Sequence, residues 1–188
     1  MPTMKAALYA GIRQIGIHDV ERLSPPPGFV QIATTQVGIC GSDLHNYFGE
    51  WEASDSLALG HETCGEVVAL GEGVTTLQLG DKVAIECFSH CGHWVYCQTG
   101  QYNYCLERMW VSEQQHGGFA EYTNAHASGL FKLPASMSDE EGALVEPLAV
   151  AVRALAQARA THQDRVAVIG GGTIGQLCLA VAKANGVK

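Results

Sequence analysis

The stretch Gly60-His61-Glu62-Thr63-Cys64-Gly65-Glu66-Val67-Val68-Ala69-Leu70 carries two signals that decide how this chain is interpreted. Its second half is a mostly apolar run of strand length, and it ends at the turn signal Gly71-Glu72-Gly73. Its first half places a histidine beside a carboxylate where that run begins. The stretch therefore predicts a strand with two potential metal ligands at its start.

Other short β-type runs fill the first 135 residues or so. Residues 29–33 and 82–85 have the length and composition of strands, and Pro25-Pro26-Pro27-Gly28 and Gly80-Asp81 are turn signals between the runs. This spacing predicts a partly open β-barrel or sandwich over the first part of the chain.

The pattern changes near residue 138. Ser138 can cap a helix together with Glu141, three residues later, and Ala-rich sequence at helical spacing continues through Ala160. A continuous apolar run over residues 165–169 is typical of a buried strand in a parallel sheet. Because such a strand needs neighbours on both sides, we expect the chain to stop within this second domain.

A glycine-rich turn follows that predicted strand and precedes a helix predicted over residues 176–184. Its glycines, Gly170, Gly172 and Gly175, allow a tight turn and let a dinucleotide pyrophosphate approach the N-terminus of the helix. The acidic residue that would distinguish NAD from NADP is expected about 20 positions further on, beyond Lys188. The sequence therefore predicts a nicotinamide cofactor without choosing between the two.

Composition narrows the classes of partner. Hydrophobic residues make up 47% and charged residues 16% of the 188 residues, which is typical of a packed globular protein. The net charge of −8 argues against nucleic acid and anionic membranes as partners. No apolar run is long enough to cross a bilayer or to form a signal core, so we expect a cytoplasmic protein. Its seven cysteines then indicate metal ligands or buried residues rather than disulfides.

The motif Cys40-Gly41-Ser42-Asp43-Leu44-His45 supplies a third potential metal ligand. A catalytic zinc needs three protein ligands and an open position, and a thiolate, an imidazole and a carboxylate are all suitable. Taken singly, Cys40 is better explained as a small buried residue and His61 as a loop histidine without a metal.

Together, the motif that begins at Cys40, the stretch that begins at Gly60 and the turn signals at Gly71 and Gly80 resemble the zinc-containing medium-chain alcohol dehydrogenases. The motifs occur in the same order, and the resemblance covers nearly the whole chain. The resemblance is closest to the sorbitol, threonine and related polyol dehydrogenases, whose crossover helix begins Glu-Pro-Leu, as Glu146-Pro147-Leu148 does here. It implies a mainly β (α+β) GroES-like catalytic domain over residues 1–150. The crossover helix and the first strand, turn and helix of a truncated Rossmann α/β domain follow over residues 151–188.

The resemblance also assigns roles. Cys40 and His61 match the two zinc ligands shared across the family, and Glu62 either binds the zinc or stands just behind it. Glu146 takes the place of a second cysteine ligand, which in the polyol branch is a glutamate that sometimes acts through water. The sequence does not decide whether Glu62 or Glu146 binds the zinc directly.

Two further residues match the family's proton relay from substrate to water. The Ser42 hydroxyl would pass the proton and the His45 imidazole would exchange it. Alternatively, Ser42 is a hydroxyl in the first turn of a helix and His45 a surface histidine. Asp43 is expected to orient His61 by a hydrogen bond.

A second cysteine-rich segment resembles the family's structural-zinc lobe, Cys-Gly-x-Cys-x-x-Cys and then a fourth cysteine. Cys91, Cys97 and Cys105 are in register, but Trp94 stands where the second cysteine belongs. Three thiolates are one ligand short of a closed site. Either the metal is lost and the lobe is held by packing, or a nearby residue replaces the ligand, and the candidates are His93, Cys87 and His90.

These features predict a zinc-dependent oxidoreductase that transfers a hydride between a secondary alcohol and NAD(P). The alcohol is expected to be a polyol or a related compound. A small-molecule alcohol is then the partner, and the intact protein is expected to form a homo-oligomer. The alternative with the same fold is a zinc-binding GroES-like module without turnover. A nucleic-acid-binding zinc ribbon conflicts with the acidic charge, and a zinc-free quinone reductase would lack Cys40, His61 and Glu62.

Overall fold

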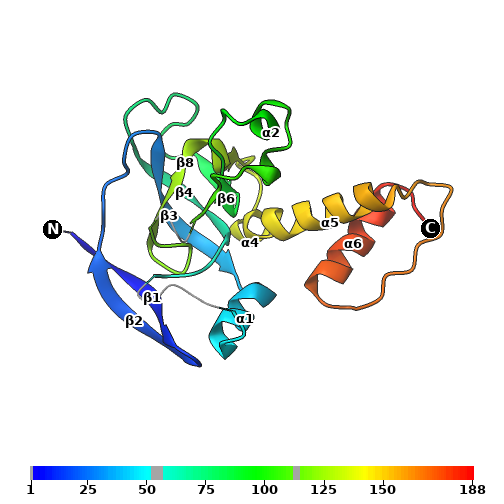
Figure 1. Ribbon diagram of the computed structural model, residues 1–188, viewed down its shortest axis with the longest axis horizontal. Coiled ribbons are helices and arrows are strands. Elements are labelled where there is room, and N and C mark those ends of the chain that lie inside the picture. The colour runs from blue at the N-terminus through cyan, green and yellow to red at the C-terminus, as the bar shows by residue number, and fades with distance from the viewer. Residues whose placement is uncertain (1, 52–56, 112–114) are drawn as a thin grey trace. The chain divides into compact units, whose positions relative to one another are not determined.

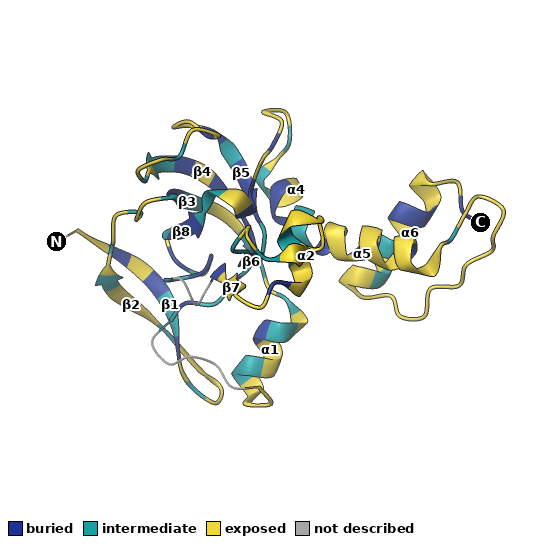
Figure 2. Ribbon diagram, turned by 45° about the horizontal axis from the view of Figure 1, so that its top comes forward, coloured by how far each residue is buried: buried dark blue, intermediate teal, exposed yellow. Residues whose placement is uncertain are grey.

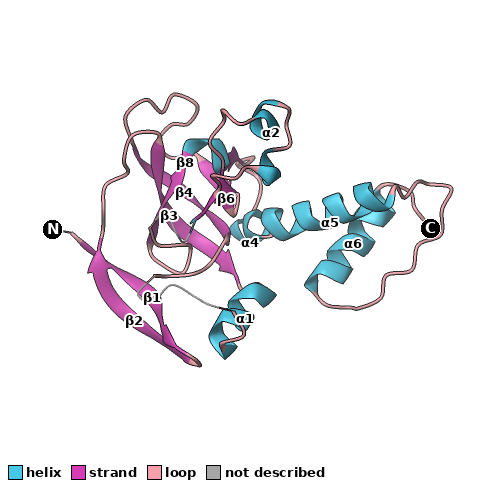
Figure 3. Cartoon of the chain, viewed as in Figure 1, coloured by secondary structure: helices cyan, strands magenta, loops and turns pink. Residues whose placement is uncertain are grey.

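The computed structural model describes residues 2–51, 57–111 and 115–188, which divide into two compact units, Met1–Ala143 and Leu144–Lys188. Among the described residues, all strands belong to the first unit, and the second unit is built from helices and loops (Figure 3). The candidate metal ligands other than Glu146 lie in the first unit.

Five antiparallel strands form the main sheet of the first unit, in the order β8-β3-β4-β5-β9. Figure 1 labels β3, β4 and β8 of this sheet. The runs predicted over residues 29–33, 65–70 and 82–85 all lie in this sheet, so these three predictions are confirmed. The strands are β3 (Phe29–Gly38), β4 (Glu62–Leu70), β5 (Lys82–Ile85), β8 (Tyr122–His126) and β9 (Leu130–Lys132).

Branched apolar side chains from this sheet form the core of the first unit. Val30, Ile32, Val67, Val83 and Ile85 are at most 2% exposed and belong to one cluster. Burying each such side chain contributes about 1.5–3 kcal/mol. Figure 2 shows the buried positions concentrated on the central strands, and this packing fixes the strand ends from which the ligands project.

Smaller elements surround the sheet. β1 (Thr3–Gly11) and β2 (Gln14–Glu21) form an antiparallel hairpin, and the helix α1 (Gly41–Phe48) follows β3. A second small ladder encloses the cysteine-rich segment. The ladder pairs β6 (Phe88–Ser89) with β7 (Met109–Trp110), and the short helices α2 (Val95–Gln98) and η1 (Tyr102–Tyr104) lie between these strands in the chain. A further short helix, η2 (Ala127–Gly129), follows β8.

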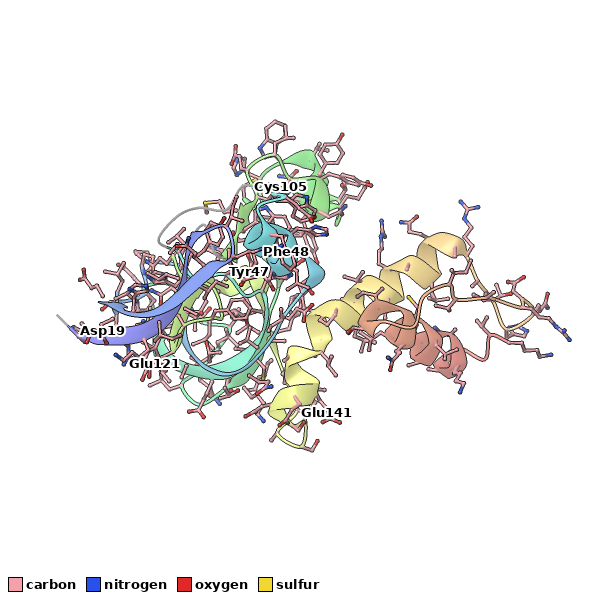
Figure 4. The ribbon with its side chains drawn as sticks, turned by 90° about the horizontal axis from the view of Figure 1, so that it is seen from below. Asp19, Tyr47, Phe48, Cys105, Glu121 and Glu141 are labelled. Carbon is pink, nitrogen blue, oxygen red and sulfur yellow. The ribbon has the colours of Figure 1, made fainter. Side chains whose placement is uncertain are left out.

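The predicted helix start at Ser138 is confirmed. The Ser138 hydroxyl accepts a hydrogen bond from the Glu141 backbone N–H at 3.2 Å, and the Glu141 carboxylate accepts one from the Ser138 N–H at 2.8 Å. This reciprocal cap begins α4 (Asp139–Ala143), the last element of the first unit. Figure 4 labels Glu141 in that short helix.

Two helices make up the second unit. α5 (Val145–Ala158) and α6 (Thr173–Ala184) pack through a small cluster that includes Ala151, Leu155 and Val181. α6 begins at the glycine-rich turn and covers the helix predicted over residues 176–184.

The strand predicted over residues 165–169 is not formed, and that prediction is wrong for this structure. The segment is irregular, and the Ile169 side chain is fully exposed. The physical reason is that a parallel strand is stabilised by hydrogen bonds to neighbouring strands. Residues 144–188, all of which the structure describes, contain no other strand. None of the helices in the described part of the chain is long and apolar enough to span a bilayer.

Candidate metal centres and the glycine-rich turn

Three side chains of different chemistry converge in the first unit. A sulfur of Cys40, a ring nitrogen of His61 and a carboxylate oxygen of Glu62 all lie within 4.8 Å of one another. Glu62 is buried, whereas Cys40 and His61 are half-buried, so the cluster remains accessible from solvent. We call these three residues the first cluster.

The ladder between β3 and β4 brings this cluster together. β3 ends at Gly38 and β4 begins at Glu62, and these two residues are direct partners in the ladder. Cys40 and His61 therefore lie just beyond the paired ends of adjacent strands. Gly38 also makes room for the ligand, because a Cβ at that position would collide with the Glu62 carboxylate. Sequence reasoning missed this role, since it depends on strand register.

Asp43, a buried residue in the first turn of α1, connects the two segments that carry the ligands. Its Oδ2 accepts a hydrogen bond from the Cys40 N–H at 2.8 Å, and the Gly60 backbone also hydrogen-bonds to this carboxylate. Its Oδ1 lies 3.9 Å from His61 Nδ1, which is longer than a hydrogen bond. Asp43 therefore holds the backbone beside both ligands and acts on the His61 ring through its charge.

Burial raises the pKa of the Glu62 carboxyl above its ordinary value, although the charge of His61 and a hydrogen bond with Cys40 oppose the shift. Burial likewise raises the pKa of Asp43, against the hydrogen bond from the Cys40 backbone. A bound cation would favour the ionised forms of both groups. A thiolate, an imidazole and a buried carboxylate with one accessible side therefore fit zinc.

The residues predicted to move protons lie on α1, near this cluster in the chain. Ser42 is half-buried, and His45 is exposed on the same helix. His45 Nδ1 lies 2.5 Å from Glu50 Oε2, and its ring stacks on Trp51 with centroids 4.5 Å apart. These contacts fix the orientation of the ring and direct Nδ1 to a carboxylate. Neither contact was predicted from the sequence.

A second group of ligand atoms lies in residues 86–111, which we call the cysteine lobe. The sulfurs of Cys91, Cys97 and Cys105 lie within 4.8 Å of one another, although none forms a disulfide. Cys91 Sγ lies 3.8 Å from Cys97 Sγ and 3.5 Å from Cys105 Sγ. Figure 4 labels Cys105, which lies in this lobe close to α2.

The surroundings of these thiols differ. A hydrogen bond from the Cys91 backbone lowers the pKa of the buried Cys105 thiol, whereas desolvation raises the pKa of Cys97. His93, which the sequence offered as a substitute ligand, groups with Cys91 and the carboxylate of Glu107 within 4.8 Å. Glu107 was not predicted, because a glutamate two residues after the last cysteine does not belong to the cysteine pattern of the structural-zinc lobe.

The glycine-rich turn at residues 170–175 lies in the second unit. Gly170 has φ +107°, a conformation that favours glycine, and a Cβ on Gly175 would collide with the Gly170 carbonyl. Apart from its two chain neighbours, no residue that the structure describes would lie within 4 Å of a Cβ on Gly172. The turn thus has the local geometry that brings backbone close to backbone at the start of α6. Glu146, the fourth predicted ligand of the catalytic zinc, lies in the first turn of α5.

The chain resembles known dehydrogenases over its whole length. Residues 26–135 match the family described as alcohol dehydrogenase GroES-like domain. A sorbitol dehydrogenase from Halalkalibacterium halodurans is 43% identical over 88% of this chain and 49% of its own length. A probable D-xylulose reductase A from Aspergillus terreus is 38% identical over 95% of this chain and 52% of its own length.

A solved structure gives the same result. A putative zinc-binding dehydrogenase from Sinorhizobium meliloti, bound to NADP, matches with a TM-score of 0.92 at 30% identity. The match covers 100% of this chain and 55% of that one. The chain thus spans about half the length of these relatives. The predicted fold class, with its mainly β GroES-like domain, is confirmed.

Proposed function

The chain belongs to the zinc-containing medium-chain alcohol dehydrogenase family, and we propose that it carries the catalytic-zinc half of an NAD(P)-dependent polyol dehydrogenase. The reaction is hydride transfer between a secondary alcohol and the nicotinamide. The observation that carries this proposal is the first cluster, whose three ligand atoms of different chemistry lie within 4.8 Å of one another on an accessible side of the unit.

Cys40, His61 and Glu62 would hold the zinc, and Glu146 is proposed as a further ligand, either direct or through water. When bound there, zinc supplies Lewis acidity, which lowers the pKa of an alcohol hydroxyl. Asp43 keeps the Cys40 and Gly60 backbones in place, so the ligands are positioned before the substrate arrives.

Ser42 and His45 are proposed to carry the released proton to water. The Ser42 hydroxyl accepts the proton from the substrate as it donates its own, and His45 exchanges it with solvent. The contact between His45 Nδ1 and Glu50 supports this role, because it fixes the orientation of an imidazole that is exposed to solvent.

Gly170, Gly172 and Gly175 are proposed to bind the cofactor pyrophosphate at the N-terminus of α6. The close approach of Gly175 to the Gly170 carbonyl supports this role, because a side chain there would force the turn apart. The cofactor is NAD or NADP. We also propose a cytoplasmic location, which suits seven free cysteines, and a homo-oligomeric state for the protein.

The proposal is tested by assaying the purified chain for reduction of NAD⁺ and NADP⁺ with sorbitol, xylitol and 2,3-butanediol. Turnover should fall at least about a thousandfold in Cys40→Ser, because a metal Lewis acid contributes several kcal/mol. Cys178→Ser, the same change in the second unit, should retain it. Equal turnover in Cys40→Ser and wild type would contradict the proposal.

The second candidate function is a zinc-binding module without turnover. The observation that favours it is the irregular backbone over residues 165–169, where a cofactor-binding turn normally follows a strand. Zinc bound at the first cluster, together with no binding of NADH or NADPH by fluorescence titration, would favour this candidate over the dehydrogenase.

A further inference from the structure

The sulfur positions in the cysteine lobe match three corners of a tetrahedral metal site. With a zinc–sulfur bond of about 2.3 Å, tetrahedral geometry separates the sulfurs by about 3.8 Å. Cys91 Sγ lies 3.8 Å from Cys97 Sγ and 3.5 Å from Cys105 Sγ. These separations are far longer than a disulfide bond, which is about 2.05 Å.

Backbone hydrogen bonds hold two of these sulfurs in place. The N–H groups of Cys91 and Glu107 donate to Cys105 Sγ, and that of Gly92 donates to Cys97 Sγ. Such bonds satisfy a thiolate that also binds a metal. The lobe therefore arranges its three sulfurs through its main chain as well as through side-chain packing.

Trp94, which stands where the second cysteine belongs, contacts a carboxylate that can replace the missing ligand. Trp94 offers only an indole N–H, which donates and cannot bind a cation. That N–H donates to Glu107 Oε1 at 3.0 Å, and His93 Nε2 lies 3.3 Å from Glu107 Oε2. The Glu107 carboxylate and Cys91 Sγ lie within 4.8 Å of each other.

We propose that Glu107 is the fourth ligand of a second metal site, with Cys91, Cys97 and Cys105, and that Trp94 and His93 position its carboxylate. The site would take zinc or another divalent metal that accepts three thiolates and one carboxylate. This second site shares no ligand with the first cluster, so its test does not depend on the proposed reaction.

The contacts favour Glu107 over His93 as the ligand. Both ring nitrogens of His93 are engaged, Nδ1 with the Cys91 carbonyl at 3.3 Å and Nε2 with Glu107. The carboxylate has about four lone-pair positions, and its contacts with Trp94, His93 and the Cys91 thiol use three of them. A metal would take the place of the Cys91 thiol proton, so the carboxylate retains capacity to bind it. Within the described residues, Glu107 groups with Cys91 and His93 but not with the other two sulfurs, whereas Cys87 and His90 belong to no group of potential ligands. A bound metal would therefore draw the Glu107 carboxylate toward the sulfurs of Cys97 and Cys105.

The test titrates cobalt(II) into the metal-free chain, because cobalt gives strong visible bands in a tetrahedral thiolate site. The bands that Cys105→Ser removes define the signal of the lobe. In Glu107→Gln, cobalt affinity at this site should fall at least about 100-fold, more than the loss expected for an outer partner. His93→Gln should lose about tenfold, because it removes only such a partner.

Two controls keep the test decisive. Glu72→Gln makes the same change on an exposed loop and should bind as wild type does. Adding Trp94→Cys to Glu107→Gln should restore binding, because it supplies a thiolate at the family position, and this separates a lost ligand from a misfolded lobe. The proposal is overturned if Glu107→Gln keeps wild-type affinity, if His93→Gln loses more than Glu107→Gln does, or if the wild-type lobe binds no cobalt.

Discussion

In the first cluster, Cys40, His61 and Glu62 project from the paired ends of β3 and β4, whereas the cysteine lobe carries its sulfurs on turns and short helices. The first cluster mixes sulfur, nitrogen and oxygen and stays accessible. The lobe offers three sulfurs, one of them buried, and hydrogen bonds from its own main chain.

The difference favours separate roles for the two proposed metal sites. An accessible site with mixed ligands on a rigid sheet suits a metal that must also receive a substrate. A sulfur-rich site in a segment with little apolar core suits a metal that holds the segment together. Perturbing the sheet should therefore affect the first cluster alone, and the predictions below test this separation.

The largest effect is expected from Asp43→Asn. It removes the charge that accepts hydrogen bonds from the Cys40 and Gly60 backbones, so both ligand-bearing segments loosen. Zinc affinity at the first cluster should fall about 100-fold, the upper end for an outer partner. Competition with a chromophoric chelator measures it, and a comparable loss in the lobe would show that the two sites are coupled.

A smaller effect is expected from Gly38→Ala. The new Cβ would collide with the Glu62 carboxylate, which is the end of a flexible side chain and can turn away. Metal affinity at the first cluster should therefore fall about tenfold, while the free energy of unfolding changes by less than about 1 kcal/mol. Unchanged affinity in this variant would show that Glu62 does not bind the metal.

The smallest effect on metal binding is expected from Ser138→Ala. It removes the cap of α4, which should lower the free energy of unfolding by about 1 kcal/mol in a urea titration. Both metal affinities should stay as in wild type. A loss at either site would indicate that general stability, and not local geometry, controls binding, and would undo the comparison.

Local patterns in the sequence predicted much of the fold. The strands over residues 29–33, 65–70 and 82–85 and the cap at Ser138 follow from composition and spacing, and the structure has them. The strand over residues 165–169 was predicted from its apolar run, but forming a strand depends on neighbours that the pattern of one segment does not contain.

For the candidate sites, residue types were predictable and their supports were not. Cys40, His61 and Glu62 belong to motifs, and the structure brings them together. The space that Gly38 leaves for Glu62 depends on strand register, and the contact of Glu107 with Trp94 depends on how a turn folds back. Both are contacts between residues that no short motif relates.

The most direct test of the account is the zinc content per chain of wild type, Cys40→Ser and Cys105→Ser, measured side by side by elemental analysis. The account predicts that each variant loses one equivalent relative to wild type, because each removes a ligand of a different site. A full zinc complement in Cys40→Ser would contradict the assignment of the first cluster as a metal centre.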